Sequence, residues 1–320
     1  MLGPGAISRD FVTGLRSSTY GILHAVGSSS AERAAAFAAE HGAEASGSYD
    51  DVVARDDVDA VYIGTVHTTH AELATRALEA GKAVLCEKPA SPTAEEVERV
   101  LDAAARAKKP FLEAFKTRFG PFADALRALV AGGELGRPQR VEAAFGFAAG
   151  SREGRLFDPA LAGGAILDVG CYPVALAVDL AAAAGMPIDA PVVQGVEAGL
   201  VGGVDGDAST DISFADLTAS VSTSILRGLP RSALVAFEGG EVFAPDVWGG
   251  RVRSASTLIV RRGGEERRIE VPVVQPMAAE ADALSLALAE ARLEVPEMPW
   301  AHTRAVARVL TDWRGAALGQ

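Results

Sequence analysis

The sequence predicts a two-domain protein: a Rossmann-type domain with a parallel sheet, followed by an α+β domain with a large, mostly antiparallel open sheet. The first third of the chain alternates apolar runs with helical segments, which is typical of βαβ units. From about Arg137, strand-like segments follow one another with few helices between them. The 320 residues, of which 49% are hydrophobic, are enough for two cores. We place the domains at residues 1–116 and 117–320.

The first domain shows a regular alternation of strands and helices. Residues 58–64 form a nearly continuous apolar run, as expected for a parallel strand that is covered on both faces. Residues 31–41 have a helical pattern that ends before Gly42. Such alternation predicts a parallel sheet with right-handed crossovers. The other expected elements are strands at 22–26, 83–86 and 111–115, and helices at 7–15, 71–80 and from Thr93 onward.

The second domain is expected to consist mainly of antiparallel strands. Gly239-Gly240 and Gly263-Gly264 are typical of hairpin turns between such strands. One long helix, at about 165–184, interrupts the strands, and two helices close the chain. The expected strands lie at 140–147, 192–199, 209–214, 219–225, 233–237, 257–261 and 267–273.

The composition argues against several classes of protein. A net charge of −12 disfavours binding to nucleic acids or anionic membranes, because both require a basic surface. No stretch of ~18 apolar residues lacks charges and turn formers, so we expect no membrane span. The N-terminus does not resemble a signal peptide. The two cysteines, Cys86 and Cys171, lack metal-site spacing. We therefore expect a cytoplasmic protein with reduced cysteines and no metal.

A candidate phosphate-binding loop lies at the N-terminus, where Gly3-x-Gly5-x-x-Ser8 matches a dinucleotide-binding fingerprint. In such loops the backbone approaches a pyrophosphate at the start of a helix. The fingerprint also needs a preceding strand, but only Met1-Leu2 come before Gly3, so we expect that strand to be missing. The alternative is an N-terminus that binds nothing. The residues predicted to bind the pyrophosphate are Gly3, Gly5, Ala6 and Ile7.

The end of the second strand predicts the type of cofactor. An acidic residue at this position would bind the ribose 2′-hydroxyl of NAD. Here Ser28, Ser29 and Ser30 follow the strand, and Arg33 lies one turn into the next helix. Hydroxyl groups and a cation suit a 2′-phosphate, so we favour NADP, with NAD as the alternative. These serines are also typical of a helix N-cap, and both interpretations can hold together.

Four segments carry a resemblance to a known family: Gly3–Ser8, Thr65–Ala71 (TVHTTHA), Ala80–Pro89 (AGKAVLCEKP) and Gly163–Pro173 (GGAILDVGCYP). In these residues the chain resembles the glucose–fructose oxidoreductase/inositol dehydrogenase (Gfo/Idh/MocA) family. It is most similar to the branch that contains dihydrodiol dehydrogenases. The resemblance extends over nearly the whole chain, and the Glu-Lys-Pro block is its most specific part. It implies a nicotinamide-dependent oxidoreductase with a cis Lys88-Pro89 peptide bond.

The chain departs from the family pattern at some positions. Val66 stands where the family often has proline, and Ser29 where NADP-using relatives often have arginine. Tyr172 stands where many members have histidine. We expect further cofactor contacts from the loop after the third strand and from the Glu-Lys-Pro block, with helix anchoring as the alternative role of the second histidine. These expected contacts are Thr65, His67, His70, Glu87 and Lys88.

Lys88, Asp168 and Tyr172 are the candidate catalytic residues. Tyr172 is expected to take the substrate hydroxyl proton as hydride leaves the carbon. A free phenol titrates near ~10, and a nearby Lys88 ammonium would lower this pKa. Lys88 would also stabilise a developing alkoxide, and Asp168 would orient the group beside it. The sequence leaves open whether Tyr172 or Lys88 carries the proton.

Each of these residues also has a structural explanation. A lysine before proline is usually a solvated strand end, a tyrosine on an Ala-rich helix usually belongs to the core, and an aspartate near a helix start is usually a cap. Taken together at family spacing, Lys88, Asp168 and Tyr172 favour a site. For Arg118, substrate contact and a salt bridge are both open, whereas Trp300 and His302 are expected to pack.

The function that we predict is hydride transfer between NAD(P) and a hydroxyl or carbonyl carbon of a sugar, polyol or cyclic diol. The alternative is a non-catalytic dinucleotide-sensing or protein-binding relative, or a truncated inactive form. Alternate apolar residues of the second sheet, such as Val221 and Ile225, are expected to be exposed in a monomer. We therefore expect a homodimer or homotetramer through this sheet. Nothing in the sequence names the substrate.

Overall fold

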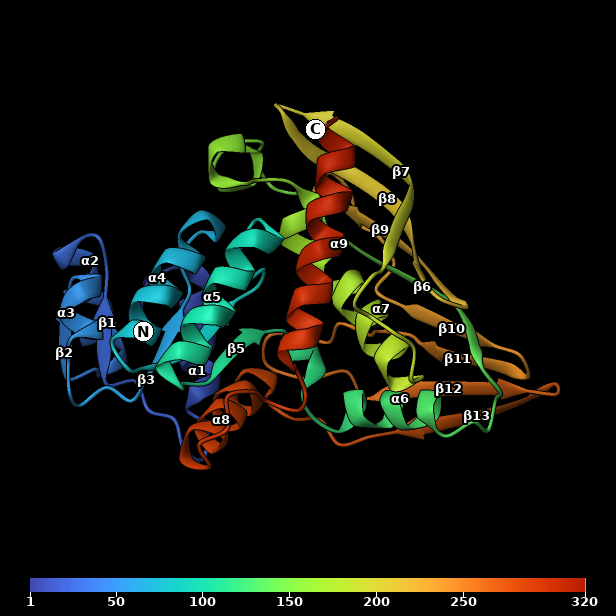
Figure 1. The fold of residues 1–320 in the computed structure, drawn as a ribbon, viewed down its shortest axis with the longest axis horizontal. Helices are drawn as coiled ribbons and strands as arrows, with labels where there is room; N and C mark the ends of the chain where they lie inside the picture. Colours follow the sequence, from blue (N-terminus) through green and yellow to red (C-terminus); the bar gives the residue numbers. More distant parts are fainter. Residues whose placement is uncertain (320) are drawn as a thin grey trace. The chain divides into compact units, whose positions relative to one another are not determined.

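The computed structural model describes residues 1–319 and divides into two compact units, which are described separately (Figure 1). The first unit contains Met1–Ser91 and Glu95–Lys116, and also takes in Gln275–Trp300, which we had placed in the second domain. The second unit contains Pro92–Ala94, Thr117–Val274 and the chain from Ala301 onward. The first unit is therefore assembled from segments that lie far apart in the sequence.

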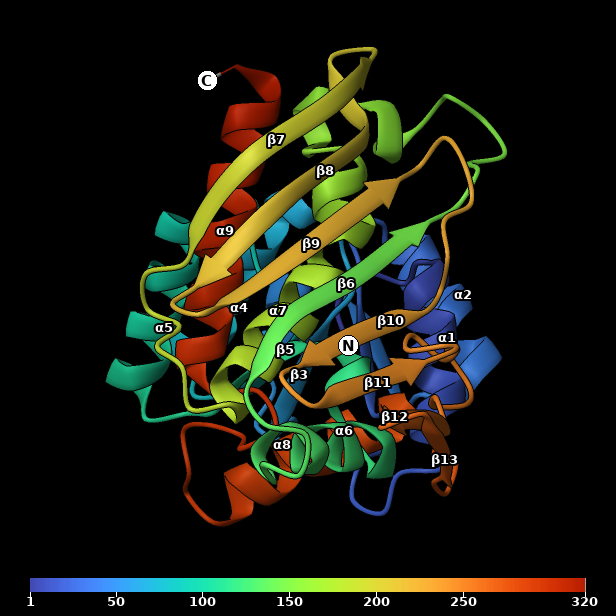
Figure 2. The ribbon, with the colours of Figure 1, turned by 90° about the vertical axis from the view of Figure 1, so that its right-hand side faces the viewer.

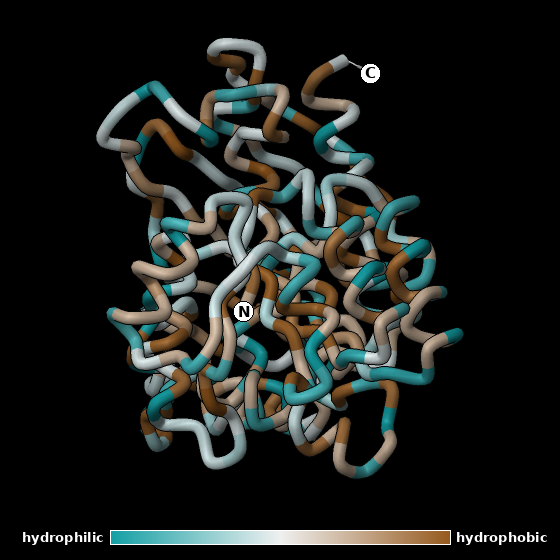
Figure 3. Tube along the Cα trace, turned by 90° about the vertical axis from the view of Figure 1, so that its left-hand side faces the viewer, coloured by the Kyte–Doolittle hydropathy of each residue, from teal (hydrophilic) through white to brown (hydrophobic). Residues whose placement is uncertain are grey.

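The first unit contains a parallel sheet with helices packed against it. Strand β4 is buried along its whole length, and hydrophobic residues gather along the strands in the middle of this unit (Figure 3). Helix α4 packs on β3 and β4, and α8 packs on β4 and β5. The strands are β1 (Ala25–Gly27), β2 (Ala45–Gly47), β3 (Ala60–Ile63), β4 (Ala83–Glu87) and β5 (Phe111–Ala114). The helices are α1 (Ala6–Leu15), α2 (Ala31–His41), α3 (Tyr49–Val53), α4 (His67–Glu79), α5 (Ala94–Ala107) and α8 (Pro276–Ala289).

The first strand of this sheet, which we expected to be missing, is present as a single β-bridge residue, Leu2. Leu2 pairs in parallel with Ile63 of β3 on one side and with Gly27 of β1 on the other. The Leu2 N–H donates to Tyr62 O (2.8 Å), and Gly27 N–H donates to Met1 O (2.8 Å). Leu2 is fully buried. The sheet order is thus β2-β1-Leu2-β3-β4-β5, which is the Rossmann order.

The second unit is dominated by an eight-stranded sheet with the order β13-β12-β11-β10-β6-β9-β8-β7 (Figure 2). Its neighbours pair antiparallel except for β6 and β9, which are parallel. The strands are β6 (Pro138–Gly146), β7 (Val192–Val201), β8 (Val204–Phe214), β9 (Leu217–Ser224), β10 (Ala233–Phe237), β11 (Gly240–Ala244), β12 (Thr257–Arg262) and β13 (Glu265–Glu270). The helices are α6 (Pro121–Ala131), α7 (Cys171–Ala183) and α9 (Trp300–Leu318), the last of which begins at the final residue of the first unit.

The two faces of this sheet differ in polarity. Helix α7 packs on β6 and β9 and covers one face (Figure 2). Val221 and Ile225 are 1% and 0% exposed, so our expectation that they would be exposed was wrong. Ser220 and Ser222 take the half-buried positions of the open face instead. Because side chains of a strand alternate, a phase error of one residue exchanges the two faces.

One helical stretch of the described chain, residues 159–183, is long and apolar enough to cross a membrane by length and composition alone. Nearly all of it is buried inside the second unit, as expected for a core helix. Burial of this kind makes the stretch weak evidence for a membrane span.

Candidate active site

The glycine loop is shaped by close backbone contacts. Gly3 has φ +85°, and a Cβ on it would lie 2.6 Å from Thr65 Cγ2. The Ser8 hydroxyl is fully buried and donates to Gly3 O at 2.6 Å. Helix α1 starts just after Gly5, and no side chain caps that end. The first N–H groups of a helix have no intrahelical partner, so this loop fits a pyrophosphate.

The segment after β1 contains a helix N-cap and a cation beside hydroxyl groups. These are the two features that we inferred from its serines. Ser30 caps α2 by accepting from Arg33 N–H at 3.3 Å, and Ser28 Oγ accepts from Ser30 N–H at 3.1 Å. The exposed Arg33 guanidinium donates to Ser29 Oγ at 3.0 Å. A guanidinium beside a hydroxyl at the carboxyl end of β1 fits a ribose 2′-phosphate.

The loop after β3 is held by His70. This residue is fully buried, and its Nδ1 lies 2.8 Å from Pro89 O. Its Nε2 lies 3.3 Å from Thr65 O. His67 is also buried, and its ring meets that of His70 edge-on at 5.8 Å. His70 therefore anchors the loop to the Glu-Lys-Pro segment, which was our alternative role for it.

Lys88 directly follows the buried strand β4, and the Lys88-Pro89 peptide bond is cis, as the resemblance implied. Glu87 accepts from Tyr62 Oη at 2.9 Å and from Lys88 N–H at 3.3 Å. Burial raises the pKa of Glu87, and it raises that of Tyr62 well above the usual range. The Tyr62 ring stacks on Phe11 at 3.7 Å. Glu87 thus joins β3 to the peptide backbone of Lys88.

A second buried acid belongs to the same unit. Glu280, on α8, is 2% exposed, and its Oε1 has no hydrogen-bond partner in the described part of the chain. Burial first, and then the negative charge of Glu87, raise the pKa of Glu280 well above its usual value. Glu280 therefore holds its proton to higher pH than an exposed glutamate does. No sequence pattern marks this residue, because an acid on a helix is normally solvated.

In the second unit, Asp168 and Tyr172 lie on either side of a change in helix type. Residues Ile166–Gly170 form a π-helical turn, and α7 begins at Cys171. Pro173 is the third residue of α7, where its missing N–H cannot bond to Val169 O. Such wide turns are frequent at functional sites. Asp168 and Tyr172 are 6% and 9% exposed.

The start of this helix is capped from another element. Asp205, at the beginning of β8, accepts from Ile166 N–H at 2.6 Å and is fully buried. Thr223 of β9 donates to Ala165 O at 3.1 Å. Gly164 has φ +121°, and a Cβ on it would lie 2.2 Å from Asp205 Oδ1. Gly164, the second glycine of the pair that we identified by resemblance, therefore makes room for a capping carboxylate that the sequence did not reveal.

Four further residues surround Asp168 and Tyr172. Arg155 forms an ion pair with Asp168 at 2.9 Å. The Tyr172 ring lies 5.3 Å from that of Phe145 and 6.0 Å from that of Trp248. Phe145 and Trp248 are stacked at 5.5 Å, and Arg231 lies over Phe145 at 5.6 Å. We did not predict these contacts, since they depend on the folding of loops onto the end of β6.

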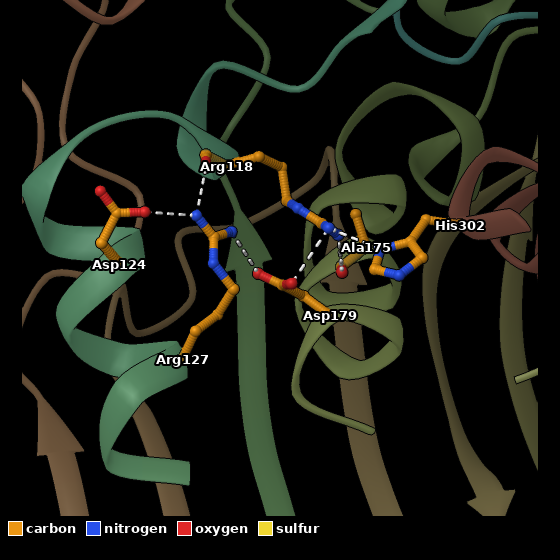
Figure 4. A network of polar contacts seen from close by, with 6 residues as sticks. All are labelled: Arg118, Asp124, Arg127, Ala175, Asp179 and His302. Carbon is orange, nitrogen blue, oxygen red and sulfur yellow. Dashed lines mark hydrogen bonds and ion pairs between the residues drawn. The ribbon is translucent and has the colours of Figure 1, made fainter. Parts of the chain in front are cut away.

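Arg118 forms a salt bridge, which was one of the two roles left open for it. Its guanidinium is buried, pairs with Asp179 at 3.0 Å and lies 2.6 Å from His302 Nδ1 (Figure 4). Arg127 extends the network to Asp179 at 3.2 Å (Figure 4). Burial and the two arginines lower the pKa of His302 to about 3. The network joins α6 and α9 to α7, the helix that carries Tyr172.

No group of histidine, cysteine, aspartate and glutamate that could hold a metal occurs among residues 1–319. Cys86 and Cys171 are both buried and reduced. The proposed cofactor residues and Lys88 lie in the first unit, and Asp168 and Tyr172 lie together in the second. The encounter of Lys88 with Tyr172 stays a prediction.

Comparison with protein families gives two matches. Residues 1–115 match the family described as "Oxidoreductase family, NAD-binding Rossmann fold". Residues 123–241 match the Gfo/Idh/MocA C-terminal domain.

Curated relatives match most of the chain. The D-xylose 1-dehydrogenase (NADP(+)) of Hypocrea jecorina is 31% identical over 79% of this chain and 71% of its own length. The trans-1,2-dihydrobenzene-1,2-diol dehydrogenase of Xenopus tropicalis is 29% identical over 96% of this chain and 94% of its own.

Two solved structures have a similar fold. The aldose–aldose oxidoreductase of Caulobacter crescentus, complexed with glycerol, has a TM-score of 0.87 and 24% identity, covering 99% of this chain and 96% of its own. The 3-ketoreductase KijD10 of Actinomadura kijaniata, in complex with NADP and TDP-benzene, has a TM-score of 0.86 and 22% identity over 96% and 94%.

Proposed function

The chain belongs to the Gfo/Idh/MocA family of NAD-binding oxidoreductases, and we propose that it transfers a hydride between a nicotinamide cofactor and a CH–OH carbon of a sugar, polyol or cyclic diol. The observation that carries this proposal is the setting of Tyr172. Tyr172 is 9% exposed, its ring lies beside the stacked rings of Phe145 and Trp248, and it follows the buried Asp168 by four residues. A phenol and a carboxylate in such a setting suit proton transfer at a hydroxyl group.

We favour NADP as the cofactor, with NAD as the alternative. Ser28, Ser29 and Arg33 would hold the 2′-phosphate, and the glycine loop would hold the pyrophosphate. A bound nicotinamide supplies the acceptor or donor of the hydride. The Hypocrea jecorina relative is named as NADP-dependent, which supports the same choice. Thr65, His67, Glu87 and Lys88 would complete the cofactor site, with His70 holding the loop behind it.

We propose that Tyr172 and Lys88 act on the same substrate. In oxidation, Tyr172 accepts the hydroxyl proton while the carbon loses its hydride, so that the alcohol becomes a carbonyl; reduction returns both. The ammonium of Lys88 favours the phenolate and hydrogen-bonds the substrate oxygen. Asp168, held by Arg155 at 2.9 Å, orients this proton transfer.

The substrate class rests on the relatives. Their names specify a cyclic diol and a sugar, both of which have a secondary or anomeric hydroxyl that can lose hydride. The test is spectrophotometric: NADP⁺ or NAD⁺ is offered with xylose, glucose, glycerol and trans-dihydrobenzenediol, and formation of reduced cofactor is followed. Absence of turnover with every pair would remove the proposal.

The catalytic roles are tested by Lys88→Met and Tyr172→Phe. Each change should lower kcat by about 10²-fold or more, because each removes a group that handles the proton. The matched controls are Lys108→Met and Tyr20→Phe, since both of these residues are exposed in the first unit. Near-normal turnover in both site variants would contradict the assignment.

We also propose a homodimer or homotetramer through the open face of the second sheet. Leu234, Phe243 and Ile259 are half-buried cross-strand neighbours on that face. Because Val221 and Ile225 are buried, we base the proposed association between subunits on this apolar row. Light scattering of the wild type and of Phe243→Asp provides the test, with Ser220→Asp as the control on the same face. A monomeric wild type would refute the proposal.

A further inference from the structure

The strongest unassigned feature is a pair of half-exposed arginines, one paired with Asp168 and the other lying over Phe145. Arg155 NH1 lies 2.9 Å from Asp168 Oδ1, and the Arg155 side chain is 48% exposed whereas that of Asp168 is 9% exposed. A guanidinium has five N–H donors in a rigid fork, and one carboxylate oxygen cannot occupy them all. The solvent-facing side of Arg155 therefore presents donors beside the candidate catalytic aspartate.

Arg155 is held at this place by its neighbours. Leu156 and Phe157, the next residues of the chain, pack together with Phe145 against a buried cluster of Ala165, Val169 and Ile225. Val169 directly follows Asp168 on the π turn. Movement of the Arg155 backbone away from Asp168 would thus expose apolar side chains, so the arginine belongs to the wall of the site.

Arg231 approaches the same cluster from another loop. Its guanidinium lies 5.6 Å from the centre of the Phe145 ring, and that ring lies 5.3 Å from Tyr172. It pairs with Asp246 at 3.1 Å and donates to Gly249 O. The Arg231 side chain is 43% exposed. One half-exposed guanidinium group therefore lies beside Asp168, and a second lies over Phe145, whose ring neighbours that of Tyr172.

The charge of these residues opposes that of the whole protein. A chain of net charge −12 repels anions, and Asp168 would strengthen this repulsion within the site. Arg155 neutralises Asp168, and Arg231 neutralises Asp246. Arginine binds carboxylates and phosphates with paired hydrogen bonds, which a neutral hydroxyl cannot accept in the same way. Arg118 cannot serve this purpose, because it is buried in the network of Figure 4.

We infer that Arg155 and Arg231 select a substrate that carries an anionic group, a carboxylate or a phosphate, in addition to its hydroxyls. This inference rests on the proposed function and adds a substrate class to it. The substrate would be an acidic or phosphorylated sugar or polyol, with its anion against the two guanidinium groups and its reacting hydroxyl toward Tyr172.

The test compares three substrates that share one ring: D-glucose, D-glucuronate and D-glucose 6-phosphate. With wild-type enzyme and NADP⁺, kcat/KM for one or both anionic sugars should exceed that for glucose by about tenfold or more, since hydrogen bonds to charged groups have this strength. A preference for glucuronate alone assigns a carboxylate, and a preference for the 6-phosphate alone assigns a phosphate. Raising the ionic strength from about 0.05 M to about 0.5 M should reduce the preference.

Substitutions of the two arginines test whether these residues cause the preference for anionic over neutral sugars. Arg155→Gln and Arg231→Gln should each lower the anionic-to-neutral ratio by about tenfold. Arg155→Lys should retain part of the ratio, because it keeps the charge but loses the fork. Arg152→Gln, an exposed change on the same loop, should leave the ratio unchanged. A folded Arg155→Lys variant keeps the test valid if Arg155→Gln is unstable.

Two results would overturn the inference: equal kcat/KM for the three sugars in the wild type, or an anionic preference that survives both glutamine changes. If glucose is oxidised and the preference is absent, the anionic substrate class fails and the dehydrogenase assignment stands. If no polyol is oxidised, calorimetric titration of the NADP-loaded protein with glucuronate tests the anion site independently of turnover. Binding that is weakened in both glutamine variants supports the anion site, and no binding removes it.

Discussion

The carboxylate of Asp205 lies against Gly164 so closely that a Cβ on this glycine would be 2.2 Å from Oδ1. The other oxygen of the same carboxylate accepts from Ile166 N–H at 2.6 Å. The helix that carries Asp168 and Tyr172 has no capping side chain of its own at this end. Its register is therefore set by an acid from β8 and by the absence of a side chain at Gly164.

Gly164→Ala should destabilise the protein by about 2–4 kcal/mol, because the new methyl group meets a fully buried carboxylate and the backbone has φ +121°. Chemical denaturation measures the change in the free energy of unfolding. Gly154→Ala is the matched control, since Gly154 also has positive φ (+85°) but nothing lies within 4 Å of its Cβ position. The control should cost only about 1–2 kcal/mol. Equal effects of the two changes would show that the contact with Asp205 does not matter.

Asp205 should make the stability depend on pH. Burial raises its pKa from 3.8 to about 6, so the native state binds the proton more tightly than the unfolded state. Its contribution is fully present below pH 3.8 and is lost as the pH rises through about 6, a change of about 3 kcal/mol. The difference in free energy of unfolding between the wild type and Asp205→Asn should therefore fall over this range. A difference that stays constant with pH would contradict the buried, titrating carboxylate.

The sequence predicted elements best where local signals mark both ends. Helix α2 matches the expected bounds of 31–41, because Ser30 caps it and Gly42, with φ +75°, ends it. Helix α4 begins at His67, earlier than the expected 71, since Val66 at its N-cap offers no side-chain bond. The short elements β2 and α3 were missed because three to five residues carry too little periodicity.

Long-range features of the site could not be predicted. Lys88, Asp168 and Tyr172 were found by resemblance, but Arg155, the helix-capping Asp205 and the buried Glu280 were not. Each of these three acts across a large sequence separation or from a loop, where no spacing rule applies. Leu2 is a similar case. Two residues have no strand pattern, yet their position between β1 and β3 gives them a complete set of sheet hydrogen bonds.

Glu280→Gln should leave stability at pH 7 unchanged or increase it. Burial and the negative charge of Glu87 raise the pKa of Glu280 well above its usual value, so the folded protein holds this proton more tightly than the unfolded chain. In the unfolded state Glu280 ionises at neutral pH, which favours unfolding, whereas glutamine does not ionise. The benefit of the change should therefore grow as the pH rises above the ordinary pKa of glutamate. Thermal unfolding at several pH values measures it, with the exposed Glu79→Gln as control. A loss of stability at pH 7 would contradict a raised pKa of Glu280 in the folded protein.

His302 should act on stability in the opposite direction from Asp205. Burial and the positive charges of Arg118 and Arg127 lower its pKa from 6.5 to about 3, so the unfolded state binds the proton more tightly. Stability from this group is present above pH 6.5 and falls as the pH drops toward 3, by about 5 kcal/mol. In the wild type this slope partly cancels that of Asp205, so single substitutions are needed to resolve either one. His302→Gln should flatten the acid side of the stability profile, as measured by denaturant unfolding between pH 4 and 7. If the variant lost stability on acidification as steeply as the wild type, the imidazole would not be the group that titrates.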